Sequence, residues 1–139
     1  MPEQNITVLG FDFGTSWIGT AVGQTRTGTA SPLQAVRMIN NKPDWPSIAK
    51  LIDTWQPQKL IVGLPMSMDG KPHQLTRLCE KFSRQVEGRF QIKTELSDER
   101  LTTREAWQIV ENNSHRHISK PEIDSIAAVL ITETWLSEQ

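Results

Sequence analysis

Residues 6–23, which spell ITVLGFDFGTSWIGTAVG, decide the fold. Residues 6–11 are apolar and partly β-branched, which is typical of a buried strand, and Asp12 follows at its C-terminal end. A Gly-Thr turn at residues 14–15 leads into residues 18–23, where a second apolar run predicts a second strand. Glycines that indicate bends or close approach of another backbone stand at positions 19, 23 and 28. The stretch predicts two adjacent strands with a carboxylate where the first one ends.

The rest of the chain alternates strand and helix patterns. A third strand is expected within residues 33–38, and three strands with short connections predict an antiparallel meander. Further along we expect a helix on which Trp45, Ile48, Leu51, Ile52 and Trp55 share one face, a central strand at 59–64, a helix at 73–86 with Leu75, Leu78, Phe82 and Val86 as its apolar stripe, and a fifth strand at 90–96. Capping boxes at Thr102 and Ser119 predict two final helices. The order β-β-β-α-β-α-β-α-α implies an α/β fold with a mixed sheet flanked by helices.

Length and composition limit the classes of protein. A chain of 139 residues, 37% hydrophobic and 22% charged, predicts one globular domain over residues 1–139. The net charge of −1 differs from that of proteins that coat nucleic acid through a basic surface, although a local basic patch remains compatible with it. A single cysteine, Cys79, excludes an internal disulfide and is expected in the core. With no secretory signal pattern and no membrane-spanning run, the sequence predicts a cytoplasmic protein.

Acidic residues stand at three places where helices and strands begin or end. Asp12 ends the first strand, Asp98 and Glu99 follow the fifth, and Asp124 lies in the opening turns of the last helix beside its apolar stripe. If the first and fifth strands are parallel, their carboxyl ends share one crevice. Carboxylates gathered there repel one another unless a cation neutralises them, and Mg²⁺ or Mn²⁺ prefers such oxygen ligands. The pattern favours a two-metal phosphodiesterase site. Taken singly, each residue also fits a structural role as a turn former, a solvated side chain or a partner of the helix dipole.

The candidate substrate contacts are polar or basic residues near these acids: Thr15, Arg100, Arg104, Arg116 and Lys120. Each basic residue fits a phosphate contact, and it fits equally an ion pair or a solvated loop. The histidines that flank Arg116 lack the partner ligands of a zinc site. Trp17 differs from the other four tryptophans, because it follows the turn at the mouth of the expected crevice rather than occupying an apolar helical position.

Several short motifs occur along the chain in a fixed order: Gly10-Phe11-Asp12-Phe13-Gly14-Thr15 with Ile18-Gly19, then Val62-Gly63-Leu64-Pro65, Met68-Asp69-Gly70, Asp98-Glu99-Arg100-Leu101-Thr102-Thr103 and Asp124-Ser125-Ile126-Ala127-Ala128. Together they resemble the YqgF (RuvX) family over nearly the whole chain. The family is similar to the RuvC resolvases and has a ribonuclease-H-like fold, with a five-stranded mixed sheet in which strand 2 runs antiparallel to the others. Its members are described as Holliday junction resolvases and as nucleases that mature the 5′ end of pre-16S ribosomal RNA.

The resemblance implies a Mg²⁺- or Mn²⁺-dependent endonuclease. Asp12 and Asp124 would be catalytic metal ligands, and the third would be Asp98 or Glu99, of which we favour Glu99; strand register decides between them, because neighbours point to opposite sides. Where the family often has a basic residue after Gly-Thr, this chain has Ser16 and Trp17.

Three functions are compared. The leading hypothesis is cleavage of structured RNA, most specifically 5′-end maturation of pre-16S ribosomal RNA, with branched DNA as the second class of substrate and the ribosome as a candidate partner. The second is a non-catalytic nucleic-acid-binding or ribosome-assembly module, which the near-zero net charge allows. The third is an actin- or sugar-kinase-like ATPase, which the length disfavours because those enzymes need two domains. No membrane partner is expected, and both a monomer and a homodimer fit, since a resolvase needs two sites related by symmetry.

Overall fold

The computed structural model describes residues 5–64, 74–98 and 118–139. In chain order its helices and strands are β1 (Thr7–Phe13), β2 (Trp17–Gln24), β3 (Thr29–Ile39), β4 (Lys42–Pro43), α1 (Trp45–Trp55), β5 (Lys59–Leu64), α2 (Gln74–Phe90), β6 (Thr94–Asp98) and α4 (Lys120–Ser137). The expected helix that starts at Thr102 lies outside the described residues. No helix in the described ranges is both long and apolar enough to cross a membrane.

The strands form one mixed sheet in the order β4-β3-β2-β1-β5-β6. β2 runs antiparallel to β1 and β3, whereas β1, β5 and β6 are parallel. The expected meander and the antiparallel second strand are therefore confirmed. Because β1, β5 and β6 are parallel, their carboxyl ends lie at the same edge of the sheet, which is where the acidic residues were expected to gather.

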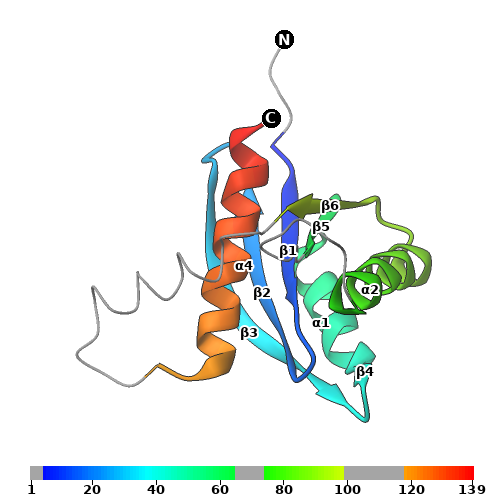
Figure 1. Ribbon diagram of the computed structural model, residues 1–139. Helices are drawn as coiled ribbons and strands as arrows, with labels where there is room; N and C mark the ends of the chain where they lie inside the picture. Colours follow the sequence, from blue (N-terminus) through cyan, green and yellow to red (C-terminus); the bar gives the residue numbers. More distant parts are fainter. Residues whose placement is uncertain (1–4, 65–73, 99–117) are drawn as a thin grey trace.

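Helices cover both faces of this sheet, α4 on one and α1 and α2 on the other (Figure 1). On the α1–α2 face, a core cluster joins Leu9, Phe11, Phe13, Ile18, Val22, Val36, Leu60 and Val62 of the strands to Ile48 of α1 and Cys79, Phe82 and Val86 of α2. On the α4 face, Val8 and Ile61 pack against Ile131, Trp135 and Leu136. Cys79 is buried as expected, and its Sγ donates to the carbonyl of Gly63 at 2.9 Å. Residues of one strand alternate between these two cores, as a strand buried on both faces requires.

Small residues in β1 and β2 let α4 lie unusually close to the sheet. A Cβ at Gly10 would stand 1.8 Å from Oγ1 of Thr132, and one at Gly23 would stand 3.0 Å from Cδ1 of Leu136. At Gly19 it would stand 1.9 Å from the carbonyl oxygen of Asp124. The close backbone approach predicted for these glycines is confirmed at Gly19, whereas Gly23 makes room for side chains of α4 and Gly28, with a φ of 69°, lies in a turn.

The strand boundaries differ from expectation in two places. The expected fifth strand at 90–96 was wrong at its start, because Phe90 is the last residue of α2 and continues the apolar stripe four residues after Val86. Gln91, with a φ of 55°, ends the helix, and β6 begins at Thr94. The count of five strands also missed β4, which pairs with the end of β3 across a turn where Asn40 and Asn41 both have positive φ. Two such residues form the tight hairpin turn that asparagine favours.

Two residues expected on buried helical stripes are exposed instead. Trp55 at the end of α1 is 38% exposed, and Leu78 in α2 is 39% exposed. Both lie on stripes whose other members reach the core, so helical periodicity located the buried face correctly and overestimated its width.

Candidate active site

Asp12 lies near the end of β1, between two strands. Its register partners are Gly19 in β2 and Gly63 in β5. Gly10, two residues earlier, faces α4, and strand residues two apart share a face, so Asp12 faces α4 as well. The side chain is only 8% exposed although the sheet edge is close. β1 therefore holds a buried carboxylate on the α4 face.

Asp124 reaches the same place from α4. Its carbonyl lies directly over Gly19, which is the register partner of Asp12. Paired residues on antiparallel strands have Cα atoms about 4.5–5.5 Å apart, so Asp124 packs over the strand position that directly neighbours Asp12. Asp124 is 5% exposed. Two acids separated by 112 positions of sequence are thus brought together.

The start of α4 is fixed by hydrogen bonds on both sides of Asp124. Ser119 and Glu122 form the predicted capping box, in which the backbone N–H of Glu122 donates to Oγ of Ser119 and the N–H of Ser119 donates to the Glu122 carboxylate. Oγ of Ser125 accepts a hydrogen bond from the N–H of Thr20 in β2 at 3.2 Å. The first two turns of α4 are therefore anchored to β2 through a side chain next to Asp124.

The two oxygens of Asp124 have different surroundings. Oδ1 accepts a hydrogen bond from Nζ of Lys120, one helical turn earlier. Oδ2 is buried and is the one such side-chain oxygen without a hydrogen-bond partner among the described residues. Burial raises the pKa of Asp124 above its ordinary value, and the ammonium of Lys120 opposes that rise. A buried anionic oxygen without a donor is costly, and a divalent cation would remove that cost, so the residues present fit a metal ion.

The third carboxylate position lies two strands away from Asp12. Gly63 pairs with Asp12 on one side and with Ser97 of β6 on the other, so Ser97 stands in the same row and on the same face. Asp98 comes next and is the register partner of Leu64. Glu99 lies outside the described residues. Within the described ranges no three His, Cys, Asp or Glu residues gather as a metal-binding group.

The predicted substrate contacts are placed only in part. Arg100, Arg104 and Arg116 lie outside the described residues. Thr15 is exposed in the turn after β1 and lines a hollow of about 520 Å³ with Phe13 and α2 residues on the α1–α2 side of the sheet. Lys120 pairs with Asp124. The charge of Lys120 is therefore engaged in an ion pair with Asp124.

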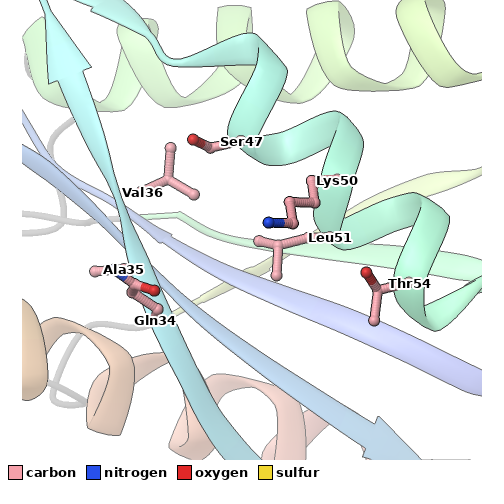
Figure 2. Close-up of a pocket in the computed structure, with 7 residues that line it drawn as sticks. All are labelled: Gln34, Ala35, Val36, Ser47, Lys50, Leu51 and Thr54. Carbon is pink, nitrogen blue, oxygen red and sulfur yellow. The ribbon is translucent and has the colours of Figure 1, made fainter.

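A separate hollow of about 270 Å³ lies between β3 and α1 (Figure 2). Figure 2 shows the side chains of Ser47, Lys50 and Thr54 along one side of α1, opposite β3. α1 covers the face of the sheet opposite α4, so this hollow is on the far side of the sheet from Asp12 and Asp124 (Figure 1). It is not part of the carboxylate site.

Sequence reasoning missed two residues near the carboxylates. Ser125 was quoted only as part of a motif, yet its hydroxyl joins α4 to β2. Arg37 in β3 was not considered, although it is the register partner of Trp17. Strand pairing, which a single sequence does not give, would have been the signal for Arg37.

Two solved structures share the fold of this chain. The chain is similar to RuvC of T. thermophilus in complex with Holliday junction substrate, with a TM-score of 0.54 and 10% identity over 96% of this chain and 95% of that one. It is similar also to the Fowlpox virus resolvase, with a TM-score of 0.56 and 12% identity over 96% of this chain and 98% of that one. At these identities the likeness concerns the fold, which is ribonuclease-H-like. The chain therefore has the fold of these two resolvases.

The family follows from sequence comparison. The model of the family described as "RuvX: Holliday junction resolvase" matches residues 6–138, so the chain belongs to the RuvX family. A relative from Histophilus somni is 49% identical over 132 residues, which cover 94% of each chain, and is named "Putative pre-16S rRNA nuclease". A relative from Actinobacillus pleuropneumoniae bears the same name and is 46% identical over 134 residues, covering 96% of this chain and 98% of its own. The expected family and fold are confirmed.

Proposed function

We propose that this chain is a divalent-cation-dependent endonuclease that hydrolyses phosphodiester bonds in structured RNA, with the 5′ end of pre-16S ribosomal RNA as its substrate. The observation that carries the proposal is the meeting of Asp12 and Asp124, two buried carboxylates from different elements, where one oxygen has no donor among the described residues. Such a pair is unfavourable by itself. It becomes favourable when it binds cations.

Asp12 and Asp124 would hold the metal, and Mg²⁺ or Mn²⁺ fits their oxygen donors. Bound there, divalent cations would polarise the phosphate and stabilise charge on the attacking and leaving oxygens. Lys120 holds Oδ1 of Asp124, and Ser125 fixes the helix turn, so Oδ2 keeps one orientation. The reaction adds water across one phosphodiester bond, and it leaves a phosphate monoester and a free hydroxyl.

Glu99 is the third ligand in this proposal. The support is its place in the motif Asp98-Glu99-Arg100-Leu101-Thr102-Thr103, which resembles that of the RuvX family and begins at the last residue of β6.

The choice of RNA follows the name of the relatives, "Putative pre-16S rRNA nuclease". Branched DNA is the second candidate, and the family description favours it. Cutting a four-way junction symmetrically would require two copies of the chain related by a two-fold axis. Maturation of ribosomal RNA would place the protein in the cytoplasm.

Cleavage assays test the proposal. A precursor RNA with a 5′ extension and a four-way DNA junction are each incubated with the protein in Mg²⁺, in Mn²⁺ and in EDTA. We expect cleavage only with metal, and a loss of at least 100-fold in rate for Asp12→Asn and for Asp124→Asn. Asp53→Asn, an exposed aspartate of α1, is the matched control and should cleave at the wild-type rate. Cleavage that survives EDTA or both substitutions would contradict the metal mechanism, and cleavage of the junction alone would reverse the choice of substrate.

A further inference from the structure

Trp17 and Arg37 form a pair across the first hairpin. Trp17 opens β2, and Arg37 is its register partner in β3. The guanidinium carbon of Arg37 lies 5.9 Å from the centroid of the Trp17 ring, within the range of a cation–π contact. Beside them, the N–H of Met38 donates to the carbonyl of Ser16 at 2.9 Å, which holds the ends of the two strands together. The pair is therefore built into the sheet.

The pair lies on the same face as the carboxylates. The neighbouring register pair, Ile18 and Val36, belongs to the core of the α1–α2 face. Adjacent strand residues alternate, so Trp17 and Arg37 face the α4 side. Trp17 precedes Gly19 by two residues, about 7 Å along the strand. Since Gly19 pairs with Asp12, Trp17 stands two strand positions from the residue beside Asp12, a separation close to the length of one extended nucleotide.

Arg37 has charge available for a ligand. It is exposed and forms no ion pair among the described residues, whereas Lys120, on the same side of the sheet, is bound to Asp124. A cation–π contact with Trp17 does not use the N–H donors of the guanidinium, which lie in its own plane. Those donors match the geometry of a phosphate. Trp17 is half-buried, so part of its ring is accessible.

We propose that Trp17 and Arg37 bind the substrate nucleotide next to the scissile phosphate, with Arg37 on its phosphate and the accessible part of the Trp17 ring against its base. This inference rests on the proposed function and adds a substrate-binding site beside the carboxylates. Carboxylates repel a phosphodiester, so a cation held one nucleotide away offsets that repulsion. The ring requires an unstacked base, so the bound nucleotide belongs to a single-stranded segment.

Binding measurements on the full chain test the pair. The probe is a fluorescent RNA hairpin with a single-stranded 5′ extension, and Ca²⁺ replaces Mg²⁺ to keep the RNA intact. Arg37→Ala should raise Kd about 10-fold and reduce the slope of log Kd against log salt by about 1. Trp17→Ala should raise Kd about 10-fold, and Trp17→Phe should restore most of that loss because a phenyl ring still stacks. The control variants are Arg26→Ala in the β2–β3 turn and Trp55→Ala at the end of α1, both exposed and remote from Asp12.

An abasic probe separates stacking from a general loss of structure. One base of the extension is removed at a time. At one position the missing base should weaken binding by the wild-type protein and have no effect on binding by Trp17→Ala. A purely structural cross-strand pair would lower the melting temperature and leave Kd and salt slope unchanged, and that result would overturn the inference. Equal losses in the Arg26 and Trp55 controls would overturn it as well.

Failure of this inference and failure of the nuclease proposal give different results. If the protein binds RNA through this pair and never cleaves it, the nuclease proposal fails and the binding site stands. If the protein cleaves RNA and both variants bind and cleave as wild type, the nuclease stands and this inference fails.

Discussion

The carbonyl of Asp124 lies so close to Gly19 that a single methyl group would not fit between helix and strand. A Cβ at Gly19 would stand 1.9 Å from the carbonyl oxygen, 2.1 Å from the carbonyl carbon and 2.7 Å from the N–H nitrogen of Ser125. All three are backbone atoms, which cannot rotate away. Because Gly19 is also the register partner of Asp12, this contact places the backbone of Asp124 over the strand position next to Asp12.

Gly19→Ala should therefore displace the start of α4. We expect a loss of stability of about 3 kcal/mol, because backbone rather than a flexible side chain must move, and a loss of cleavage larger than the stability loss explains. Urea unfolding and cleavage rate, measured on the same preparations, check this. The matched control is Gly88→Ala in α2, where a Cβ meets nothing within 4 Å. That change should stabilise the protein by about 0.5–1 kcal/mol. Wild-type cleavage by Gly19→Ala would contradict the packing account.

Asp124→Asn should stabilise the metal-free protein at neutral pH. The folded-state pKa of Asp124 is raised from 3.8, chiefly by burial. The folded form then binds a proton on Asp124 more tightly than the unfolded form, so the contribution of Asp124 to stability is most favourable below pH 3.8 and is lost as pH rises through the folded pKa. At pH 7 the wild-type protein bears the full free-energy cost of burying the Asp124 charge. Removing that charge should increase the free energy of unfolding by about 1 kcal/mol.

Thermal unfolding of the two proteins in EDTA at several pH values measures this difference. The advantage of the variant should be full at pH 7 and shrink as pH falls toward 4. Adding Mn²⁺ should raise the melting temperature of the wild type more than that of the variant, because ligand binding stabilises only the state that binds. A variant less stable than wild type at pH 7 in EDTA would show that Asp124 is not a destabilising buried charge.

Lys120→Met tests the partner of that charge. Without the ammonium on Oδ1, the pKa of Asp124 should rise further, and stability at pH 7 should fall by about 1 kcal/mol, a modest figure because Lys120 is largely exposed. A double-mutant cycle checks the cause. In an Asp124→Asn background the same lysine substitution should have almost no effect, and an equal effect in both backgrounds would mean that Lys120 acts elsewhere.

Glu95 forms a second charged cluster at the opposite end of these strands. It accepts hydrogen bonds from Lys59 and from Nε1 of Trp135 at 3.2 Å, and the ammonium of Lys59 lies 5.1 Å from the Trp135 ring centroid. The hydrogen bond from Lys59 is the main cause that lowers the pKa of Glu95. Its stabilisation is present above the ordinary pKa and lost as pH falls through the lowered one.

Glu95→Gln should therefore cost a few tenths of a kcal/mol at pH 7, because the pair is partly exposed and screened by solvent. Comparing unfolding at pH 7 and at low pH measures it, and the difference should vanish in acid. Cleavage should stay at the wild-type rate, since Glu95 lies away from the strand ends that hold Asp12. A large loss of cleavage would mean that this cluster and the carboxylates are coupled.

The sequence predicted most of the fold because its patterns are local. The apolar run of β1 and the Ser119 capping box each depend on residues close in the sequence, and the structure contains both. The errors arose where the apolar pattern is ambiguous or gives no signal. Phe90 begins an alternating run in the sequence, yet it belongs to the apolar stripe of α2. The turn at Asn40 and Asn41 forms a hairpin that no apolar pattern predicts.

The site was predictable in part for the same reason. Asp12 and Asp124 were chosen from their places at the ends of a strand and a helix, and the structure brings them together. That Gly19 is the spacer between them, and that Trp17 lies opposite Arg37, depends on strand register and helix docking. These are relations between distant parts of the chain, and a single sequence without strand pairing does not contain them.

The central claim is that Asp12 and Asp124 together hold divalent cations. Crystals of the protein soaked in Mn²⁺ and measured at a wavelength where manganese scatters anomalously test it most directly. The account predicts an anomalous peak between the two side chains, at about 2.0–2.3 Å from Oδ2 of Asp124 and from an oxygen of Asp12, as hard-cation coordination requires. A map with no peak there, or with its strongest peak away from both aspartates, would contradict it.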